Sequence, residues 1–182
     1  MSQKDRRRWD EKWLDSPKDR YEPHPLLLQY QSLLGVGKAL DLACGKGQNA
    51  IWLARQGYCV LGIDISPVAL TIARTEAADQ RLSDRTQFEA VDLDQWQLPA
   101  LSFDLICVFR FLDRRLFAAI SAGLRAEGLL FFATRHVGLL QRCPDANESF
   151  LLRRGELAEA FAGLQVLHNV ENDEDTEFIA RN

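Results

Sequence analysis

The segment that most constrains the fold is residues 39–49, Ala-Leu-Asp-Leu-Ala-Cys-Gly-Lys-Gly-Gln-Asn. A short apolar run gives way to a loop of small side chains, and a helical pattern follows. This order is typical of a buried strand that turns sharply into a helix. Gly45 and Gly47 have no Cβ, so the loop can adopt positive φ angles and let another molecule approach its backbone closely.

An acidic residue ends the next apolar run. Asp64 follows Asp41 by 23 residues, and in a βαβ unit this spacing places it on the neighbouring strand, beside the glycine loop. A carboxylate there can accept hydrogen bonds from both hydroxyls of a ribose, and Ile65 offers an apolar face to a base. The alternative is a turn that only leads into a helix, since Ser66 can cap a helix and Pro67 suits its first turn.

Apolar runs and helical patterns alternate along the chain after residue 37. Strands are predicted at residues 38–42, 58–64, 86–91, 103–109, 128–134, 165–170 and 177–180. Helices are predicted at residues 48–56, 67–81, 114–125 and 155–162. This alternation, with right-handed crossovers, predicts a doubly wound, mostly parallel α/β sheet. Such sheets bind ligands outside the carboxyl ends of their strands.

The length of 182 residues predicts a single domain over residues 1–182. Its core is expected at residues 37–180, and residues 1–35 are expected to form an N-terminal extension. Trp9, Trp13 and Tyr21 lie in this extension. They can either fold over a bound ligand as a lid or pack a helix onto the core.

Composition excludes several classes of function. Hydrophobic residues make up 47% of the chain and its net charge is −4, which is ordinary for a soluble globular protein and does not favour a nucleic-acid partner. No apolar run approaches the roughly 18 residues of a membrane span, and the N-terminus has no secretory signal. The four cysteines form no Cys-x-x-Cys pair, so no metal site is expected, and thiols in a reducing cytoplasm are the simplest interpretation. We therefore predict a cytoplasmic protein.

Four segments, in this order, together resemble the class I S-adenosylmethionine-dependent methyltransferases. They are Asp-Leu-Ala-Cys-Gly-Lys-Gly at residues 41–47, Asp-Ile-Ser-Pro at 64–67, Val-Asp-Leu at 91–93 and Phe-Asp-Leu-Ile-Cys at 103–107. The glycine loop alone is weakly specific, whereas the ordered set is quite specific. Within this family the chain is most similar to the small bacterial branch related to tellurite-resistance and thiopurine methyltransferases. The resemblance covers residues 37–180.

The resemblance implies a three-layer αβα, Rossmann-like sheet of seven strands in which one strand is antiparallel. It implies S-adenosylmethionine as cofactor and methyl transfer to a small-molecule acceptor as the activity. The implied cofactor-binding residues are Asp41, Ala43, Cys44, Gly45 and Gly47 for the methionine part, Asp64 for the ribose, Asp92 and Leu93 for the adenine, and Phe109 for the methionine side of the floor. Ile65 joins them as the apolar face for the base. No catalytic residue is implied.

The chain departs from the family pattern at two places. Many related loops carry glycine where this chain has Ala43, and alanine is still small enough for cofactor binding. After the strand at residues 103–109, relatives often show a histidine or tyrosine, whereas this chain has Arg110-Phe-Leu-Asp113. Near this end of the sheet, Asp113 and His136 are candidates for proton removal and Arg110 for holding an anion, against a surface or capping role for each.

Two other functions remain open. A protein that binds S-adenosylmethionine without catalysis, as a subunit of a larger enzyme, agrees with the short chain and with the Arg110–Asp113 segment. A nicotinamide-dependent oxidoreductase agrees with a glycine loop and Asp64, but the Gly-x-Gly-x-x-Gly pattern of such enzymes is missing. The sequence fixes neither the acceptor nor the oligomeric state.

Overall fold

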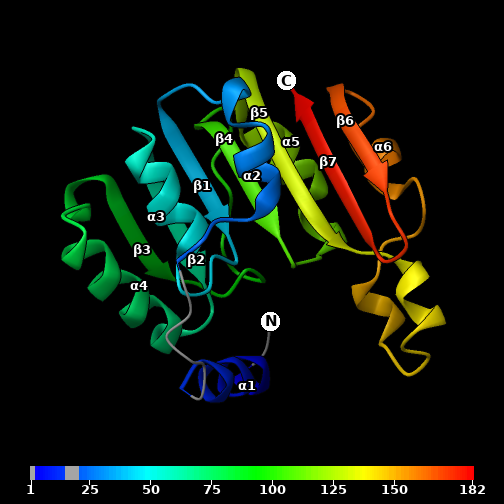
Figure 1. Ribbon diagram of the computed structural model, residues 1–182, viewed down its shortest axis with the longest axis horizontal. Coiled ribbons are helices and arrows are strands. Elements are labelled where there is room, and N and C mark those ends of the chain that lie inside the picture. Colours follow the sequence, from blue (N-terminus) through cyan, green and yellow to red (C-terminus); the bar gives the residue numbers. More distant parts are fainter. Residues whose placement is uncertain (1–2, 15–20) are drawn as a thin grey trace. The chain divides into compact units, whose positions relative to one another are not determined.

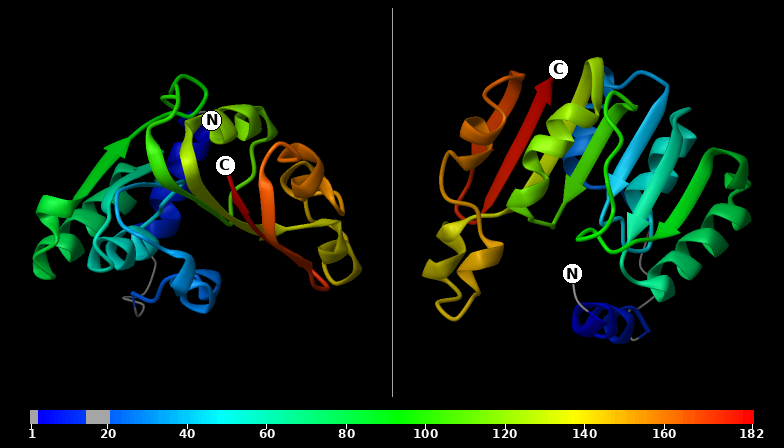
Figure 2. Two further views of the ribbon diagram at one scale, coloured as in Figure 1. Left: turned by 90° about the horizontal axis from the view of Figure 1, so that it is seen from above. Right: turned by 180° about the vertical axis from the view of Figure 1, so that it is seen from behind.

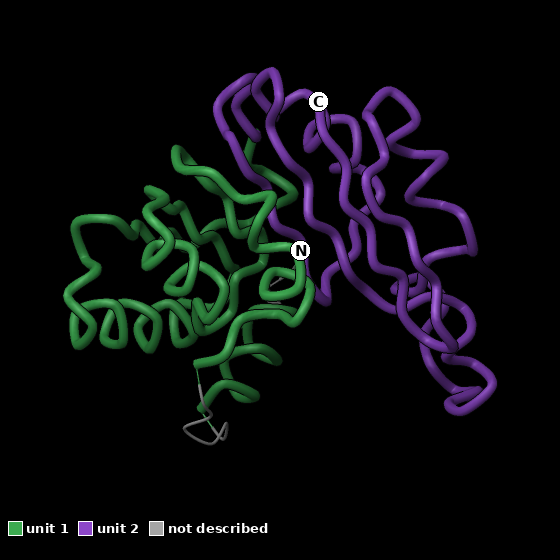
Figure 3. The backbone as a smooth tube through the Cα atoms, turned by 45° about the horizontal axis from the view of Figure 1, so that its top comes forward, with its two compact units in different colours: residues 1–97 green, residues 98–182 purple. Residues whose placement is uncertain are grey.

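The computed structural model describes residues 3–14 and 21–182, and the chain divides into two compact units, residues 1–97 and 98–182 (Figure 3). Seven strands belong to one mixed sheet, three of them in the first unit and four in the second. Helices flank the strands (Figure 1). The predicted α/β fold is therefore confirmed, while the single domain over residues 1–182 stays a prediction.

Unit 1 contains three parallel strands that are joined by helices, as in βαβ units. Its strands are β1 (Lys38–Leu42), β2 (Cys59–Asp64) and β3 (Thr86–Ala90), in the order β3-β2-β1 and all parallel. Its connecting helices are α3 (Gln48–Arg55) and α4 (Pro67–Asp79). The Ser66 hydroxyl accepts the Ala69 N–H at 3.1 Å, and Pro67 opens the helix, as the sequence predicts. Because the strands are parallel, their carboxyl ends meet at one edge of the sheet.

The N-terminal extension of unit 1 is largely helical. It contains α1 (Gln3–Leu14), α2 (Pro25–Gln29) and the 3-10 turn η1 (Gln31–Leu33). Outside the extension, a second 3-10 turn, η2 (Ser83–Arg85), precedes β3. The His24 N–H donates to Asn49 Oδ1 at 2.7 Å, which ties the start of α2 to α3. Figure 1 shows α1 beyond the carboxyl ends of β1, β2 and β3, and the view from behind in Figure 2 agrees.

Unit 2 holds the mixed half of the sheet. Its strands are β4 (Phe103–Phe109), β5 (Leu124–Arg135), β6 (Gln165–Glu171) and β7 (Asp175–Arg181), in the order β4-β5-β7-β6. Its helical segments are η3 (Arg114–Leu116), α5 (Phe117–Gly123), η4 (Val137–Gln141), η5 (Glu148–Phe150) and α6 (Glu156–Ala160). Strand β7 runs antiparallel to both β5 and β6, so the sheet has the single antiparallel strand that the family resemblance implies.

The predicted helix at residues 114–125 is wrong at its end. Helix α5 stops at Gly123, and β5 begins at Leu124, which pairs with Phe103. The register then shifts, so that Leu105 pairs with Leu129. Leu124 continues the apolar helical pattern, but its fully buried side chain belongs to the strand, and this ambiguity misled the prediction.

Two features hold unit 2 together. Phe117, Phe132, Phe161 and Phe178 pack as one aromatic cluster, with ring centroids 5.4–6.3 Å apart in the contacting pairs. Near it, the buried Glu156 carboxylate accepts hydrogen bonds from Arg114 Nε at 2.5 Å and from the Arg153 N–H at 2.7 Å. Burial alone would raise the pKa of Glu156, but the Arg114 guanidinium and the Arg153 N–H outweigh it and lower the pKa.

Candidate functional site

The loop after β1 is built from left-handed residues. Ala43, Gly45 and Gly47 have φ angles of 58°, 54° and 77°. The Cys44 N–H donates to the Ile63 carbonyl at 2.9 Å, which fastens the loop to β2. A positive φ is costly for alanine, and residues in such conformations concentrate at functional sites. Ala43 thus carries backbone strain in the tight turn between β1 and α3, and the binding role of this loop stays a prediction.

The two glycines of the loop differ in what they make room for. A Cβ on Gly47 would lie 2.9 Å from Phe88 and 3.0 Å from Ala73, so the core of unit 1 already requires glycine there. A Cβ on Gly45 would meet the ring of Trp13 at 3.0 Å. Sequence analysis assigned both glycines to close approach by a ligand. The structure explains Gly47 by packing against the core of unit 1, whereas Gly45 is buried beneath the Trp13 ring of α1.

We expect Gly47→Ala to destabilise unit 1 by about 2–4 kcal/mol, since it adds a left-handed alanine and a clash with Phe88. Gly45→Ala also adds a left-handed alanine but should cost less, because its Cβ meets the Trp13 side chain of α1 instead of the packed core. Urea unfolding followed by circular dichroism compares the two variants. Equal losses would show that packing against Phe88 contributes nothing.

Asp64, at the end of β2, holds the loop in place. Its Oδ2 accepts the Gly45 N–H at 2.8 Å and its Oδ1 accepts the Ser66 N–H at 2.9 Å, and the residue is only 8% exposed. Burial raises the pKa of Asp64, while the two N–H groups act to lower it. Each carboxylate oxygen can accept a further hydrogen bond. Asp64 therefore has both the structural role of the helix-leading turn and the remaining acceptor capacity that a ribose diol needs.

Asp41 lies deeper than Asp64. It is 1% exposed, and its Oδ2 accepts the Ala50 N–H in the first turn of α3 at 3.1 Å. Burial raises the pKa of Asp41 to about 7, against the hydrogen bond from Ala50, and the nearby Asp64 carboxylate raises it further. Its contact with the methionine part of a cofactor stays a prediction.

The third acid follows β3. The Val91 N–H donates a hydrogen bond to the Asp64 carbonyl at 3.0 Å. Asp92 is the next residue after Val91, so this bond keeps it near Asp64. Asp92 Oδ1 accepts the Asp94 N–H at 3.0 Å, and Leu93 is buried. Ile65 is buried as well, beside Asp64. The structure thus places the acids of all three strands at one edge with two apolar side chains, as the sequence predicts, while their contacts with adenine stay predictions.

Two polar residues at this edge were missed by sequence analysis. Lys46 is 4% exposed, and its Nζ lies 5.6 Å from the centre of the Trp13 ring. Asp10 Oδ1 accepts the Ser66 hydroxyl at 2.5 Å. The available signal was the helical spacing of Asp10 and Trp13, which puts both on one face of α1. Burial raises the pKa of the Cys44 thiol well above its usual value, so this cysteine stays protonated.

The aromatic residues of the extension divide between two places. Trp13 stacks on Trp9 with ring centroids 6.1 Å apart, and Trp13 covers Gly45. Burial raises the pKa of Tyr21 to about 12, and the nearby Glu76 of α4 raises it too, which places Tyr21 near α4.

The remaining candidates belong to unit 2, and its contacts account for most of them. His136 is fully buried, with Nδ1 accepting the Gly138 N–H at 2.8 Å and Nε2 lying 2.9 Å from the Asn172 carbonyl. Arg110 pairs with Asp175 at 2.7 Å, and Asp113 pairs with Arg115 at 2.6 Å. Phe109 is buried at the end of β4, and its contact with the cofactor stays a prediction.

The described residues contain no group of three or more histidine, cysteine or acidic side chains placed to hold a metal ion. Among the helices that the structure describes, none is both long and apolar enough to cross a membrane.

The segment that contains the glycine loop and the three acids is similar to known proteins. Residues 39–128 match the family described as a methyltransferase domain. The ubiquinone biosynthesis O-methyltransferase of Actinobacillus pleuropneumoniae is 31% identical over an alignment of 138 residues, and the match covers 67% of this chain and 58% of that protein. The enzyme of the same name from Coxiella burnetii is 29% identical over 119 residues, 61% of this chain and 50% of that protein. This chain spans about half the length of the curated relatives that it matches.

Solved structures share the fold at lower identity. TehB from Haemophilus influenzae superposes with a TM-score of 0.76 and 17% identity, over 87% of this chain and 62% of that chain. An S-adenosylmethionine dependent methyltransferase from Mesorhizobium loti superposes with a TM-score of 0.69 and 21% identity, over 85% of this chain and 96% of that chain. Residues 39–128 of this chain therefore match a methyltransferase domain, and the chain shares its fold with solved methyltransferase structures.

Proposed function

We propose that this protein transfers a methyl group from S-adenosylmethionine to a small-molecule acceptor. The observation that carries the proposal is Asp64, a buried carboxylate that fixes the glycine loop through the Gly45 N–H and retains acceptor capacity. The left-handed conformations of Ala43 and Gly45, and the absence of a Cβ at Gly45, support a loop shaped for a ligand.

The residues present fit this cofactor. Asp64 would hold the ribose hydroxyls, Ile65 and Leu93 would contact the adenine, and Asp92 would accept its amino group. Asp41 and the loop Ala43, Cys44, Gly45 and Gly47 would face the methionine part, with Phe109 on the methionine side of the floor. When bound, the cofactor supplies a methyl group that its sulfonium has already activated. The protein's own contribution is to orient the two partners, which in well-oriented systems is worth on the order of 7–11 kcal/mol.

The acceptor we propose needs no proton removal by the protein. Both ring nitrogens of His136 are engaged within unit 2, and Asp113 is paired with an arginine. A soft nucleophile such as a thiolate attacks without a general base, so these contacts favour it over a neutral alcohol. A place in the branch related to tellurite-resistance methyltransferases is part of this proposal, and the fold shared with TehB supports it. A cytoplasmic location, and one domain over residues 1–182, are also part of it.

Isothermal titration calorimetry with S-adenosylhomocysteine and S-adenosylmethionine tests the cofactor. We expect saturable binding of one molecule per chain, together with a rise in the melting temperature. NADH serves as the control ligand and should give neither signal. Absence of both heat and thermal shift with either adenosyl compound at millimolar concentration would contradict the proposal.

A second experiment tests catalysis. Transfer of the labelled methyl group of S-adenosylmethionine to a panel of thiols, phenols and amines is followed by mass spectrometry. We expect product from the thiols. Tight cofactor binding without product from any acceptor would instead favour the non-catalytic subunit. The ion pairs of Arg110 with Asp175 and of Asp113 with Arg115 also allow this alternative.

A further inference from the structure

Helix α1 occupies the approach to the glycine loop. A Cβ placed on Gly45 would lie 3.0 and 3.3 Å from two carbons of the Trp13 ring, so the indole lies directly against the glycine. Gly45 is the glycine of the loop that faces α1, whereas Gly47 faces the core of unit 1. The indole therefore fills the space through which a ligand would reach this backbone.

Two further contacts hold α1 in this position. Lys46, from the loop itself, lies 5.6 Å from the Trp13 ring centre. Asp10 Oδ1 accepts the Ser66 hydroxyl at 2.5 Å. Ser66 follows the Asp64-Ile65 pair that is proposed to hold the nucleoside, so α1 is fastened on both sides of the proposed cofactor site. These contacts all lie within unit 1.

From these contacts we propose that α1 is an occluding lid, which has to leave Gly45 before the adenosyl cofactor can bind. Trp13 is its blocking residue, and the hydrogen bond between Asp10 and Ser66 is its latch. The inference rests on the proposed cofactor site and adds a control of access to it. The glycine thus serves two occupants in turn, the indole in the closed state and the cofactor in the open state.

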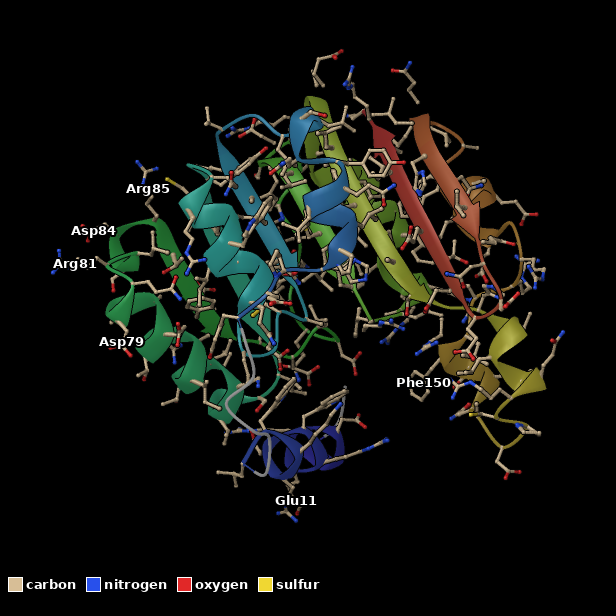
Figure 4. The ribbon with its side chains drawn as sticks, viewed as in Figure 1. Glu11, Asp79, Arg81, Asp84, Arg85 and Phe150 are labelled. Carbon is tan, nitrogen blue, oxygen red and sulfur yellow. The ribbon has the colours of Figure 1, made fainter. Side chains whose placement is uncertain are left out.

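If α1 is a lid, removal of Trp13 should raise the affinity for the cofactor. Removal of a residue that contacts the cofactor should lower it. Where only a fraction of the molecules is open, the apparent dissociation constant rises by the inverse of that fraction. If the open state is about a tenth of the population, Trp13→Ala should tighten binding of S-adenosylhomocysteine about tenfold. Glu11 lies on the outer side of the same helix and is exposed (Figure 4). Glu11→Ala is the matched control and should leave the affinity unchanged.

Calorimetry on the full chain separates the alternatives. Weaker binding by Trp13→Ala would make the indole a contact of the bound cofactor, and unchanged binding would give it no part in access. Either result overturns the lid.

The latch is tested without any ligand. In a background where Trp9, Trp52 and Trp96 are replaced by phenylalanine, Trp13 is the only tryptophan. Asp10→Ala should then raise quenching of the Trp13 emission by acrylamide about twofold, whereas Glu11→Ala should not. Stopped-flow mixing with S-adenosylhomocysteine should show an observed rate that reaches a plateau, and Asp10→Ala should raise that plateau.

The outcomes distinguish the lid from the cofactor site. Unchanged quenching by Asp10→Ala would overturn the latch. In a third outcome, quenching responds as expected but no variant binds either adenosyl compound. The cofactor assignment then fails. The lid fails with it, because removal of Trp13 has not opened a cofactor site. A rate that rises linearly with ligand concentration in every variant would show that α1 does not limit access.

Discussion

Asp64→Ala is expected to weaken the binding of S-adenosylhomocysteine by about 100-fold or more. Hydrogen bonds to a charged group are each worth about 1.5–3 kcal/mol, and the variant loses those from both ribose hydroxyls. It also leaves the Gly45 and Ser66 N–H groups without their acceptor, so the loop should keep only its backbone attachment to β2, from the Cys44 N–H to the Ile63 carbonyl. Calorimetry measures the affinity, and thermal unfolding measures the cost in stability, which we also expect to be substantial.

A second buried carboxylate supplies the matched control for Asp64. Glu156 accepts a backbone N–H from Arg153 at 2.7 Å and lies in unit 2. Glu156→Ala should therefore also lower the melting temperature, while the affinity for S-adenosylhomocysteine at a temperature where both variants are folded stays at the wild-type value. Equal loss of affinity in the two variants would mean that Asp64 acts only through stability and that the ribose is held elsewhere.

Asp41→Asn is expected to stabilise the protein at pH 8 and not at pH 4. Burial raises the pKa of Asp41 to about 7, while the same group in an unfolded chain has a pKa near 3.8. Between these values the folded protein keeps a proton that the unfolded chain releases. The stabilising contribution is present below about pH 4 and is lost as the pH rises through about 7.

The size of this effect follows from the same two values. At pH 8 the ionised carboxylate costs the folded state as much as roughly 4 kcal/mol, which the neutral amide avoids. The Asn side-chain oxygen can still accept the Ala50 N–H. Urea unfolding at pH 4, 6 and 8 measures the difference between Asp41→Asn and the wild type. A difference that does not change with pH would show that Asp41 is ionised throughout this range.

The fold was largely predictable because each element satisfies its own local rule. Ser66 and Pro67 start α4 where the capping rules place a helix, and the apolar run of β4 has the bounds that its side chains predict. The boundary at Leu124 was not predictable, because an apolar residue after a helical pattern fits the buried face of a helix and of a strand equally well. Tertiary pairing with Phe103 decided between them.

The candidate site was predictable where chemistry depends on the ends of strands. Asp41, Asp64 and Asp92 each come at or near the carboxyl end of a parallel strand, so topology alone brings them to one edge. The opposite roles of Gly45 and Gly47 were not predictable, because they depend on which side of the loop faces Phe88. The contact of Asp10 with Ser66 joins residues 56 positions apart, and local sequence rules contain no information on such a pair.

The place of β7 has a consequence for the order in which the protein is made. Strand β7 lies between β5 and β6, yet the ribosome produces it after both of them. Until residues 175–181 emerge, β6 has no neighbour in unit 2 with which to pair, and its Val166 and Val170 side chains are exposed even in the finished fold. Unpaired strands of this kind favour association between nascent chains. The emergence of residues 175–181, rather than collapse of the earlier strands, therefore sets the moment at which β6 can pair and unit 2 is protected from aggregation.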